Sequence, residues 1–212
     1  MDLTLYSYHR NSAGQRVRIA LNLKGVDYRY LSVAEIGWDT YRKINPQGLL
    51  PALKVGERIV AQSTAILEYL EATNPEPPLL PDDPLAAAEV RAFAQLIACD
   101  MHPLNNNRVR RFLESDLDAS EAAVLHWYRH WIVQGFASLE TMLRNRPRDG
   151  DFCFGDRPGM ADLYLVPQVQ NARRFDCDLT PYPLICAVDE ACLALPAFQA
   201  ALPENQPDYR KE

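Results

Sequence analysis

The sequence lacks the features of a membrane or secreted protein. No apolar run approaches the roughly 20 residues that a membrane-spanning helix needs, and the first residues, Met1-Asp2-Leu3-Thr4, have neither the basic nor the apolar region of a signal peptide. The five cysteines are an odd number and include no CxxC pair. Free thiols in a reducing cytosol suit this pattern better than a disulfide or zinc framework. We therefore expect a cytoplasmic protein without a metal site.

Positive charge is also in short supply. The 22 Lys and Arg residues are outnumbered by 28 Asp and Glu residues, which leaves a net charge of −6. This balance disfavours a general affinity for nucleic acid or for an anionic membrane. An anionic small-molecule ligand would need arginines gathered locally against the average field. With 48% hydrophobic and 24% charged residues in 212, the chain has an ordinary globular composition, and a good core is within reach.

Strand and helix patterns alternate in the first third of the chain. Strands are predicted at 3–7, 27–33, 52–55 and 58–60, and helices at 12–24 and 63–73, with an irregular turn and a short helix between 37 and 45. Gly56 and Glu57 provide the turn between the last two strands. This order, βαβ followed by a hairpin and a helix, predicts a compact α/β domain.

A proline-rich segment marks the predicted domain boundary. Its members are Pro75, Pro77, Pro78, Pro81 and Pro84. Such a stretch is typical of a stiff linker, so we place the boundary between residues 82 and 83. Beyond it strand patterns nearly vanish, and helical patterns cover 84–113, 120–144, 159–175 and 184–195. Residues 1–82 are thus predicted to form the α/β domain and residues 83–212 an all-helical domain.

The first candidate site lies where the helix at Ser12 begins. Ser12 and Gln15 match the S-x-x-Q capping box, so Ser12 has a plain structural interpretation as a helix cap. A hydroxyl beside the exposed N–H groups and the positive end of a helix dipole is also where a thiolate would be held. The local pattern does not separate these two interpretations.

Two further segments suggest a peptide-like ligand. Pro51 precedes a central-looking strand to which it cannot donate a hydrogen bond, and a cis Leu50-Pro51 peptide at a turn is one solution. That geometry would leave the Leu50 backbone to pair with an extended ligand. Ser63, preceded by Gln62, occupies a predicted helix N-cap, and such a helix start is a ready carboxylate site. Together the segments indicate a peptide-like ligand that carries a carboxylate.

Over essentially its whole length the chain resembles the glutathione transferases, and within them the zeta class. That class carries a serine–cysteine signature before Arg-Val-Arg-Ile-Ala-Leu, which corresponds here to residues 11–21. Further family-like runs are Asn45-Pro46-Gln47-Gly48, Gln62-Ser63, Leu79-Leu80-Pro81, Met160-Ala161-Asp162-Leu163 and Val166-Pro167-Gln168-Val169. The resemblance implies a thioredoxin-like glutathione-binding domain followed by an all-α substrate-binding domain. It also implies glutathione as the cofactor and a homodimer.

The resemblance implies roles in glutathione binding for residues of both domains. The implied set is Asn11, Ser12, Trp38, Leu50, Gln62, Ser63, His102, Asn106 and Arg108. Within it, Ser12 would stabilise the thiolate and Leu50 would bind the cysteinyl backbone. Gln62 and Ser63 would hold the γ-glutamyl carboxylate.

The chain departs from the class pattern at three positions. Ala13 replaces the signature cysteine and Gln15 the usual tryptophan. A cysteine-dependent dehalogenation or redox step is therefore not expected, whereas thiolate chemistry supported by serine is retained. Gly159 stands where the helical domain normally has a serine or threonine cap. Because glycine is a tolerated N-cap and Asp162 can occupy the third helical position, we expect that helix to persist.

The resemblance implies an enzyme that isomerises a maleyl diketo acid. The expected reaction is the glutathione-dependent cis–trans isomerisation of maleylpyruvate to fumarylpyruvate in aromatic (gentisate) catabolism, with maleylacetoacetate as the alternative substrate. The two substrates differ by one methylene and the setting of a carboxylate, a difference worth about 1–3 kcal/mol in a pocket, so the residues do not decide between them. A general glutathione-conjugating transferase and a non-catalytic interaction module on the same fold remain open.

A dicarboxylate substrate needs cationic clamps, for which the planar guanidinium of arginine is suited. The negative charge that develops on a carbonyl during the reaction needs similar support. Most surface arginines are solvated helix charges, but Arg10 directly precedes the candidate serine site. Further arginines cluster at 108, 110 and 111 in the first long helix and at 173 and 174 near a later helix end. From these we assign Arg10, Arg110 and Arg174 to the substrate. Since Arg108 and Arg110 cannot share one face of a regular helix, we assign Arg108 to glutathione.

Overall fold

The computed structural model describes residues 2–147 and 149–210, which divide into two compact units. The first comprises residues 2–79 and 193–210, and the second Leu80–Cys192. The predicted boundary between residues 82 and 83 lies close to the first division. The C-terminal segment, which was expected in the helical domain, is instead grouped with the first unit. Arg18 and Asn22 hold it there by donating to the Ala201 and Ala197 carbonyls at 2.9 Å each.

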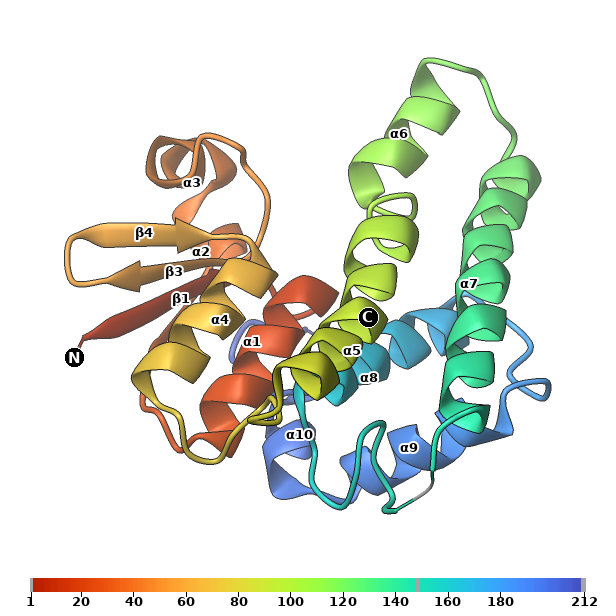
Figure 1. The fold of residues 1–212 in the computed structure, drawn as a ribbon. Coiled ribbons are helices and arrows are strands. Elements are labelled where there is room, and N and C mark those ends of the chain that lie inside the picture. Colours follow the sequence, from red (N-terminus) through yellow and green to blue (C-terminus); the bar gives the residue numbers. More distant parts are fainter. Residues whose placement is uncertain (1, 148, 211–212) are drawn as a thin grey trace. The chain divides into compact units, whose positions relative to one another are not determined.

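A four-stranded mixed sheet forms the centre of the first unit (Figure 1). Its strands are β1 (Leu3–Ser7), β2 (Arg29–Ser32), β3 (Ala52–Val55) and β4 (Arg58–Ala61), in the order β2-β1-β3-β4. β1 runs parallel to β2 and antiparallel to β3, which pairs with β4 through a hairpin turn at Gly56 (φ 57°). Every residue of β1 is buried, so the sheet is covered on both faces.

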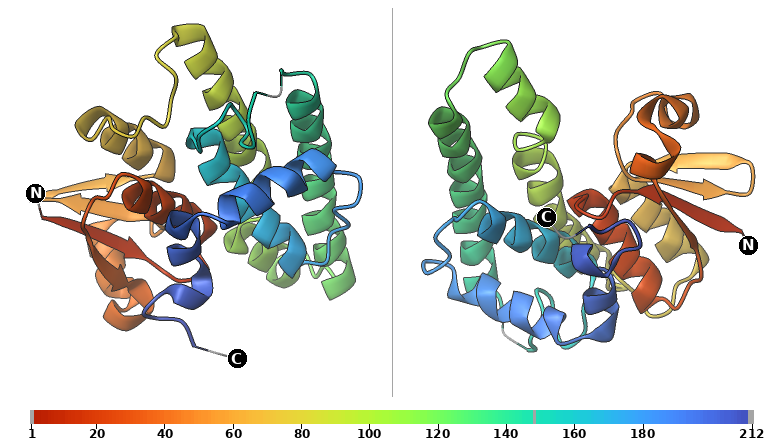
Figure 2. Two further views of the ribbon diagram at one scale, coloured as in Figure 1. Left: turned by 90° about the horizontal axis from the view of Figure 1, so that it is seen from below. Right: turned by 180° about the vertical axis from the view of Figure 1, so that it is seen from behind.

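Helices cover the two faces of this sheet (Figure 2). They are α1 (Ser12–Leu23), α2 (Val33–Ile36), α3 (Trp38–Ile44), α4 (Ser63–Thr73) and α10 (Pro196–Ala200), with a 3₁₀ turn at Pro203–Asn205. α1 packs against α4 on one face and also against α10. On the other face Tyr6 of β1 meets Tyr41 of α3, with ring centroids 6.0 Å apart. The side chain of Leu5 points the opposite way because side chains alternate along a strand.

The second unit is helical through most of its described residues. Its helices are α5 (Pro84–Gln95), the π-helical η1 (Leu96–Met101), α6 (Asn107–Ser115), α7 (Glu121–Arg144), α8 (Met160–Arg174) and α9 (Pro183–Leu193). The last three match the predicted helices to within two residues at each end. Among all described residues, we find no helix with both the length and the apolar character needed to cross a bilayer.

The prediction of one continuous helix over residues 84–113 is wrong. The chain leaves η1 at Met101, turns through residues 102–106, and begins α6 at Asn107. Pro103 has no N–H with which to continue a helical ladder. The side chain of Asn106 accepts the Arg108 N–H at 3.1 Å and so caps a new helix. His102 and Asn106 therefore lie in a turn between helices rather than on a helix face.

The start of α8 confirms that a glycine cap suffices there. Gly159 is the N-cap, and its N–H donates to Asp162 Oδ2 at 2.8 Å. The other carboxylate oxygen accepts the Cys153 N–H at 2.9 Å. Asp162 thus satisfies two backbone donors from inside the core, which compensates for the missing cap hydroxyl.

Candidate active site

One edge of the sheet collects most of the predicted residues of the first unit. The strand register pairs Tyr6 with Ala52, and Ala52 with Ala61. The segment after β1, the segment before β3 and the segment after β4 therefore all leave the sheet at this edge. These segments carry Arg10, Asn11, Ser12, Leu50, Gln62 and Ser63. Both α1 and α4 begin here, so two positive helix ends lie at the same edge.

At the start of α1 the cap is Asn11, and the prediction that Ser12 caps this helix is wrong. The Asn11 side chain accepts the N–H of Gly14, while Ser12 is the first helical residue. Asn and Ser are about equally good N-caps, so the cap falls one position earlier than the S-x-x-Q pattern indicated. Ser12 is 8% exposed at the positive end of the helix. Because Asn11 is the cap, Ser12 cannot be explained as a helix cap alone.

Gly14 fixes how closely this helix start approaches β1. A Cβ at that position would lie 2.1 Å from Ser7 Oγ and 2.7 Å from Asn11 Oδ1. No side chain fits there without moving the strand end or the cap. The glycine therefore sets the position of the whole segment from Arg10 to Ser12 against the end of β1.

The start of α4 is likewise shifted by one residue, and the prediction that Ser63 is its cap is wrong. Gln62 occupies the cap position with φ 74° and ψ 123°, a region that non-glycine residues rarely adopt. Such backbone strain is frequent at ligand-binding segments. The Gln62 side chain donates to Gln47 Oε1 at 2.8 Å and so ties the helix start to the segment before β3.

Arg16 adds a buried positive charge to this corner, and sequence reasoning missed it. Its Nη1 donates to Ser63 Oγ at 3.2 Å, and the residue is 2% exposed. Arg16 lies one helical turn after Ser12 on the same face of α1, which is the signal that would have identified it. A guanidinium and a helix N-terminus together favour a carboxylate at the start of α4.

The segment before β3 is held by hydrogen bonds from α3 and the residue that follows it. The predicted cis Leu50-Pro51 peptide is confirmed. The preceding carbonyl, that of Leu49, accepts hydrogen bonds from Tyr41 Oη at 2.7 Å and Asn45 Nδ2 at 2.8 Å. The side chain of Leu50 packs against the core cluster that includes Tyr41. These contacts fix the backbone of Leu50 at the sheet edge.

Trp38 and Arg10 complete the predicted set in the first unit. Trp38 begins α3, is 45% exposed, and lies edge-on to Tyr41 with centroids 6.2 Å apart. Arg10 is half-buried beside His9. Burial lowers the pKa of His9, Asp208 opposes this shift, and the charge of Arg10 adds to the lowering. The imidazole is therefore disfavoured as a cation, and Arg10 is the group at this loop that stays positive.

In the second unit, the turn that carries His102 and Asn106 is anchored to α7. The Asn105 side chain donates to the Tyr128 carbonyl at 3.1 Å, and the indole of Trp127 donates to the Leu104 carbonyl at 2.9 Å. The Asn106 oxygen is engaged as the α6 cap, so a ligand would meet its NH2 group. The turn follows η1, and π-helical segments are frequent at functional sites.

Arg110 and Arg174 come together on one aromatic pair. The guanidinium of Arg110 lies 4.9 Å from the ring centroid of Phe175 and 5.9 Å from that of Tyr128, and the guanidinium of Arg174 lies 5.6 Å from Phe175. The two rings stack with centroids 3.8 Å apart. We call these four residues the guanidinium cluster. Arg108, in contrast, is exposed, so α6 separates the two arginines as predicted.

The environment of the guanidinium cluster favours an anion. The buried Nε of Arg110 has no hydrogen-bond partner among the residues that the structure describes, and a buried donor normally has one. Burial raises the pKa of Tyr128 although Arg110 opposes this, so its hydroxyl remains a neutral donor. Sequence reasoning missed Tyr128 and Phe175. Only the position of Phe175 directly after Arg174 pointed to it.

Neighbouring arginines have structural partners instead. Arg129 donates to the Phe175 carbonyl at 2.7 Å and so holds the backbone of Phe175. Arg173 Nη1 lies 2.6 Å from Oδ2 of Asp189, a residue with no exposed surface. Of the adjacent pair in the last turn of α8, Arg173 thus pairs with a buried carboxylate, whereas Arg174 belongs to the guanidinium cluster.

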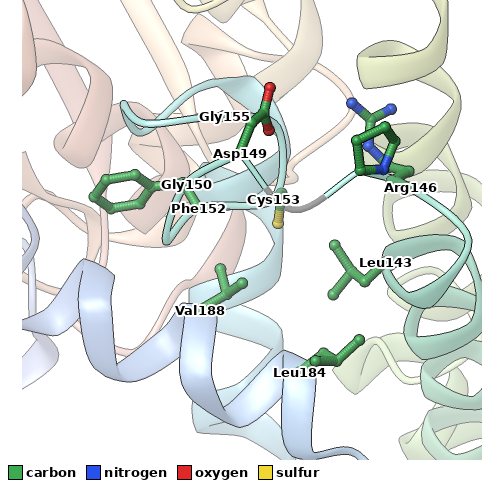
Figure 3. A pocket seen from close by; sticks show the side chains of 10 residues that line it. Leu143, Arg146, Asp149, Gly150, Phe152, Cys153, Gly155, Leu184 and Val188 are labelled. Atoms are coloured by element: carbon green, nitrogen blue, oxygen red, sulfur yellow. The ribbon is translucent and has the colours of Figure 1, made fainter.

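A small cavity of about 20 Å³ elsewhere in the second unit does not belong to this cluster (Figure 3). Leu143, Cys153 and Val188 are among its lining residues, and Leu143 lies several turns further along α7 than Tyr128. This volume suffices for about one water molecule. Burial raises the pKa of the Cys153 thiol well above its usual range, so that sulfur is not a nucleophile at neutral pH.

Comparisons with known proteins agree with this arrangement. Residues 5–78 match the family model described as glutathione S-transferase, N-terminal domain. The chain is 49% identical to the maleylpyruvate isomerase of Ralstonia sp, over 97% of this chain and 99% of the relative. It also resembles the holo structure of a maleylpyruvate isomerase described as a bacterial zeta-class glutathione S-transferase. There the TM-score is 0.94 and the identity 48%, with 98% of this chain and 100% of that one covered.

A second solved structure shows what a relative binds. It is the maleylacetoacetate isomerase from Anaeromyxobacter dehalogenans 2CP-1, solved with dicarboxyethyl glutathione and citrate in the active site. The TM-score is 0.87 and the identity 43%, with 98% of this chain and 93% of that one covered. The predicted fold, an α/β thioredoxin-like domain plus an all-α domain, is confirmed by these matches together with the observed elements. This chain belongs to the zeta class of the glutathione transferases.

Proposed function

We propose that this protein catalyses the glutathione-dependent cis–trans isomerisation of maleylpyruvate to fumarylpyruvate in the breakdown of aromatic compounds through gentisate. The observation that carries the proposal is the guanidinium cluster, in which Arg110 and Arg174 meet on Phe175. Two guanidinium groups suit a substrate with two carboxylates. The maleylpyruvate isomerase of Ralstonia sp, 49% identical over nearly the whole chain, supports the same reaction.

The first unit fits glutathione at the sheet edge. When bound, glutathione would supply the sulfur nucleophile, which adds to the alkene, leaves a single bond that can rotate, and is expelled again so that the trans alkene forms and glutathione is regenerated. The Ser12 hydroxyl donates a hydrogen bond to that sulfur, and the positive end of α1 favours its ionised form. At the start of α4, Gln62 and Ser63 hold the γ-glutamyl carboxylate, with the buried charge of Arg16 beside them.

The remaining binding residues complete the proposed cofactor site. Leu50 pairs through its backbone with the cysteinyl residue, a role that its fixed position before β3 supports. The other proposed contacts are Asn11, Trp38, His102, Asn106 and Arg108. The NH2 group of Asn106 and the guanidinium of Arg108 are donors, as the carboxylates and carbonyls of a peptide require.

The arginines act on the substrate. Arg110 and Arg174 bind its carboxylates, and Arg10 stabilises the negative charge that develops on the carbonyl conjugated to the alkene. The flat rings of Tyr128 and Phe175 contact the Arg110 guanidinium by cation–π interaction, which orients the charge without neutralising it. A carboxylate clamp of this kind keeps the two ends of the substrate bound while the bond between them rotates.

Maleylacetoacetate is the second candidate substrate, because a 43% identical relative is a maleylacetoacetate isomerase. One assay tests both possibilities: cis-to-trans conversion of each maleyl substrate, with and without glutathione, while total free thiol is measured. We expect conversion only with glutathione and no net loss of thiol. Thiol loss that matches turnover would instead establish a conjugating transferase. A protein that neither converts the substrates nor binds a glutathione column is a non-catalytic module.

We further propose that the protein works as a homodimer in the cytoplasm. Family membership supports the dimer, and five cysteines that are all free support a reducing compartment. Sedimentation equilibrium of the purified protein tests the dimer, for which twice the chain mass of 24.0 kDa is expected. A single species at the chain mass would contradict it.

A further inference from the structure

The peptide that leads into the Arg10–Ser12 segment is held from both sides by buried charged groups. The N–H of His9 donates to Asp208 Oδ2 at 3.1 Å, and the His9 carbonyl accepts from Arg18 Nη2 at 3.1 Å. His9 is 5% exposed and directly precedes Arg10. A carboxylate and a guanidinium thus fix the two ends of one residue.

Asp208 reaches this position from the C-terminal segment. Its carboxylate also accepts hydrogen bonds from Ser32 Oγ at 2.7 Å and Tyr30 Oη at 2.9 Å, both on β2. Ser32 pairs in register with Ser7, the last residue of β1, so the carboxylate lies at the sheet edge described above. Burial acts to raise the pKa of Asp208, but the hydrogen bonds from Ser32, Tyr30 and the His9 N–H prevail and lower it. The carboxylate is therefore ionised at neutral pH.

Arg18 ties the same peptide to the same segment. Its side chain is fully buried and donates to the Ala201 carbonyl through Nε at 3.2 Å and Nη2 at 2.9 Å. Its Nη1 lies 3.4 Å from Ser7 Oγ, at the end of β1. The guanidinium therefore connects the strand end, the His9 carbonyl and the C-terminal segment.

Two buried charges at one peptide need an explanation other than stability. Moving a charge out of water costs several kcal/mol, and apolar replacements of buried ion pairs are often neutral or stabilising. What Asp208 and Arg18 provide that apolar side chains cannot is a fixed backbone position at His9. The segment that follows carries the hydroxyl of Ser12 and the guanidinium of Arg10, whose effects depend on placement. A displacement of about 1 Å in a reacting group can cost roughly 100-fold in rate.

We propose that Asp208 and Arg18 are positioning residues for the isomerisation. They act through the His9 peptide, which sets the place of Arg10 and Ser12. Neither residue contacts the substrate in this proposal. The inference rests on the proposed function, since it requires that Ser12 hold an ionised thiol.

The test compares Asp208→Asn with Glu204→Gln. Glu204 is an exposed acid in the same C-terminal segment, so the control makes the same chemical change away from His9. The readouts are the pH titration of the thiol of bound glutathione, followed by thiolate absorbance, and the separate values of kcat and KM. For Asp208→Asn we expect the thiol pKa to rise by about one unit, because the displacement of Ser12 and Arg10 outweighs the loss of a negative charge, which alone would lower that pKa. We expect kcat to fall by about 10- to 100-fold, with KM for the maleyl substrate unchanged within about threefold. Glu204→Gln should match the wild type in all three.

Two milder variants guard against a folding defect. Tyr30→Phe and Ser32→Ala each remove one hydrogen bond to Asp208 but keep its charge and its contact with the His9 N–H. Each should raise the thiol pKa by less than Asp208→Asn does. A folded Asp208→Asn protein with the wild-type thiol pKa overturns the inference and leaves the proposed function intact. If Asp208→Asn does not fold, wild-type titration in both milder variants overturns it. A wild type that neither ionises bound glutathione near neutral pH nor isomerises either substrate overturns the proposed function, and this inference with it.

Discussion

The two units offer positive charge to a ligand in different ways. In the first unit it comes largely from helix ends whose positions are fixed by short contacts to the sheet, such as the close approach of Gly14 in α1 to Ser7 at the end of β1. In the second unit it comes from long side chains that rest on aromatic rings, Arg110 and Arg174 on Phe175. The backbone N–H groups of a helix end move only if the surrounding structure moves, whereas a guanidinium can change rotamer. The first arrangement suits a constant ligand and the second a substrate that changes shape during the reaction.

The candidate site residues of the two units also differ in how far they are buried. Ser12, Ser63 and Arg16 are each less than 9% exposed, while Arg108 and Arg174 lie on the surface. Electrostatic effects are stronger where water is excluded, so each buried group should carry a larger energy than each exposed one. Variants in the two units should therefore differ in the size of their effect as well as in the kinetic constant that they change.

The largest effect is expected for Ser12→Ala. Loss of a hydrogen-bond donor to a charge that the reaction depends on typically costs about 100- to 1,000-fold in kcat. Since Asn11 and not Ser12 caps α1, the free energy of unfolding should stay close to that of the wild type. Steady-state kinetics and chemical denaturation measure the two quantities. Asn11→Ala is the matched comparison and should lower stability by about 1 kcal/mol. Wild-type turnover in Ser12→Ala would remove Ser12 from the site.

The second prediction separates Arg174 from its neighbour Arg173. Arg174→Ala should raise KM for the maleyl substrate by about 10- to 100-fold, the worth of one hydrogen bond to a charged group, and leave glutathione affinity nearly unchanged. Arg173→Ala should leave KM almost unchanged but lower stability, because it strands the buried carboxylate of Asp189. The loss should be about 1–3 kcal/mol, below the value for fully buried pairs, since Arg173 is partly exposed. Equal KM effects in both variants would contradict the assignment.

These paired variants rest on contacts that the sequence does not reveal. The strands β1 and β3 and the helix α4 were predicted with their observed bounds, because each has a strong local period between clear breakers. The caps were misplaced by one residue at Asn11 and Gln62, since neighbouring polar residues compete for the same role and only backbone geometry decides. The break after Met101 was missed because apolar residues continue through η1.

The predicted site residues were placed partly by local pattern and partly by family resemblance. Local pattern identified Ser12, Leu50 and Gln62 because each lies at the end of a predicted element. It gave no indication of Asp208, which is distant in sequence from His9 and comes near it only through the packing of the C-terminal segment. Tyr128 was missed for the same reason: its stacking partner, Phe175, is distant in sequence, at the C-terminal end of α8.

A smaller effect is expected at Gly14, where α1 approaches the end of β1 closely. Gly14→Ala places a methyl group against Ser7 Oγ, which must shift. Overpacking of this kind typically costs about 1–3 kcal/mol. Because the displaced atoms include the cap of Asn11, the thiol pKa of bound glutathione should also rise slightly. Adding Ser7→Ala should recover part of the stability, as measured in a double-mutant cycle. Strict additivity of the two changes would show that the contact does not limit the position of the helix.

The smallest effect is expected for Gln62→Gly. This variant tests whether the fixed backbone of the first unit, in contrast to the adaptable side chains of the second, contributes to glutathione binding. Glycine adopts φ near 74° without strain, so this change should raise the free energy of unfolding by up to about 1 kcal/mol. It should weaken glutathione binding at the same time, because it removes the side chain and frees the backbone at the start of α4. Asp118→Gly, at φ 50° in the second unit, is the control and should leave glutathione affinity unchanged. Denaturation and calorimetric titration with glutathione give both values. A gain in stability with unchanged affinity would mean that the backbone conformation of Gln62 has no part in holding glutathione, and the fixed geometry of the first unit would then not extend to the start of α4.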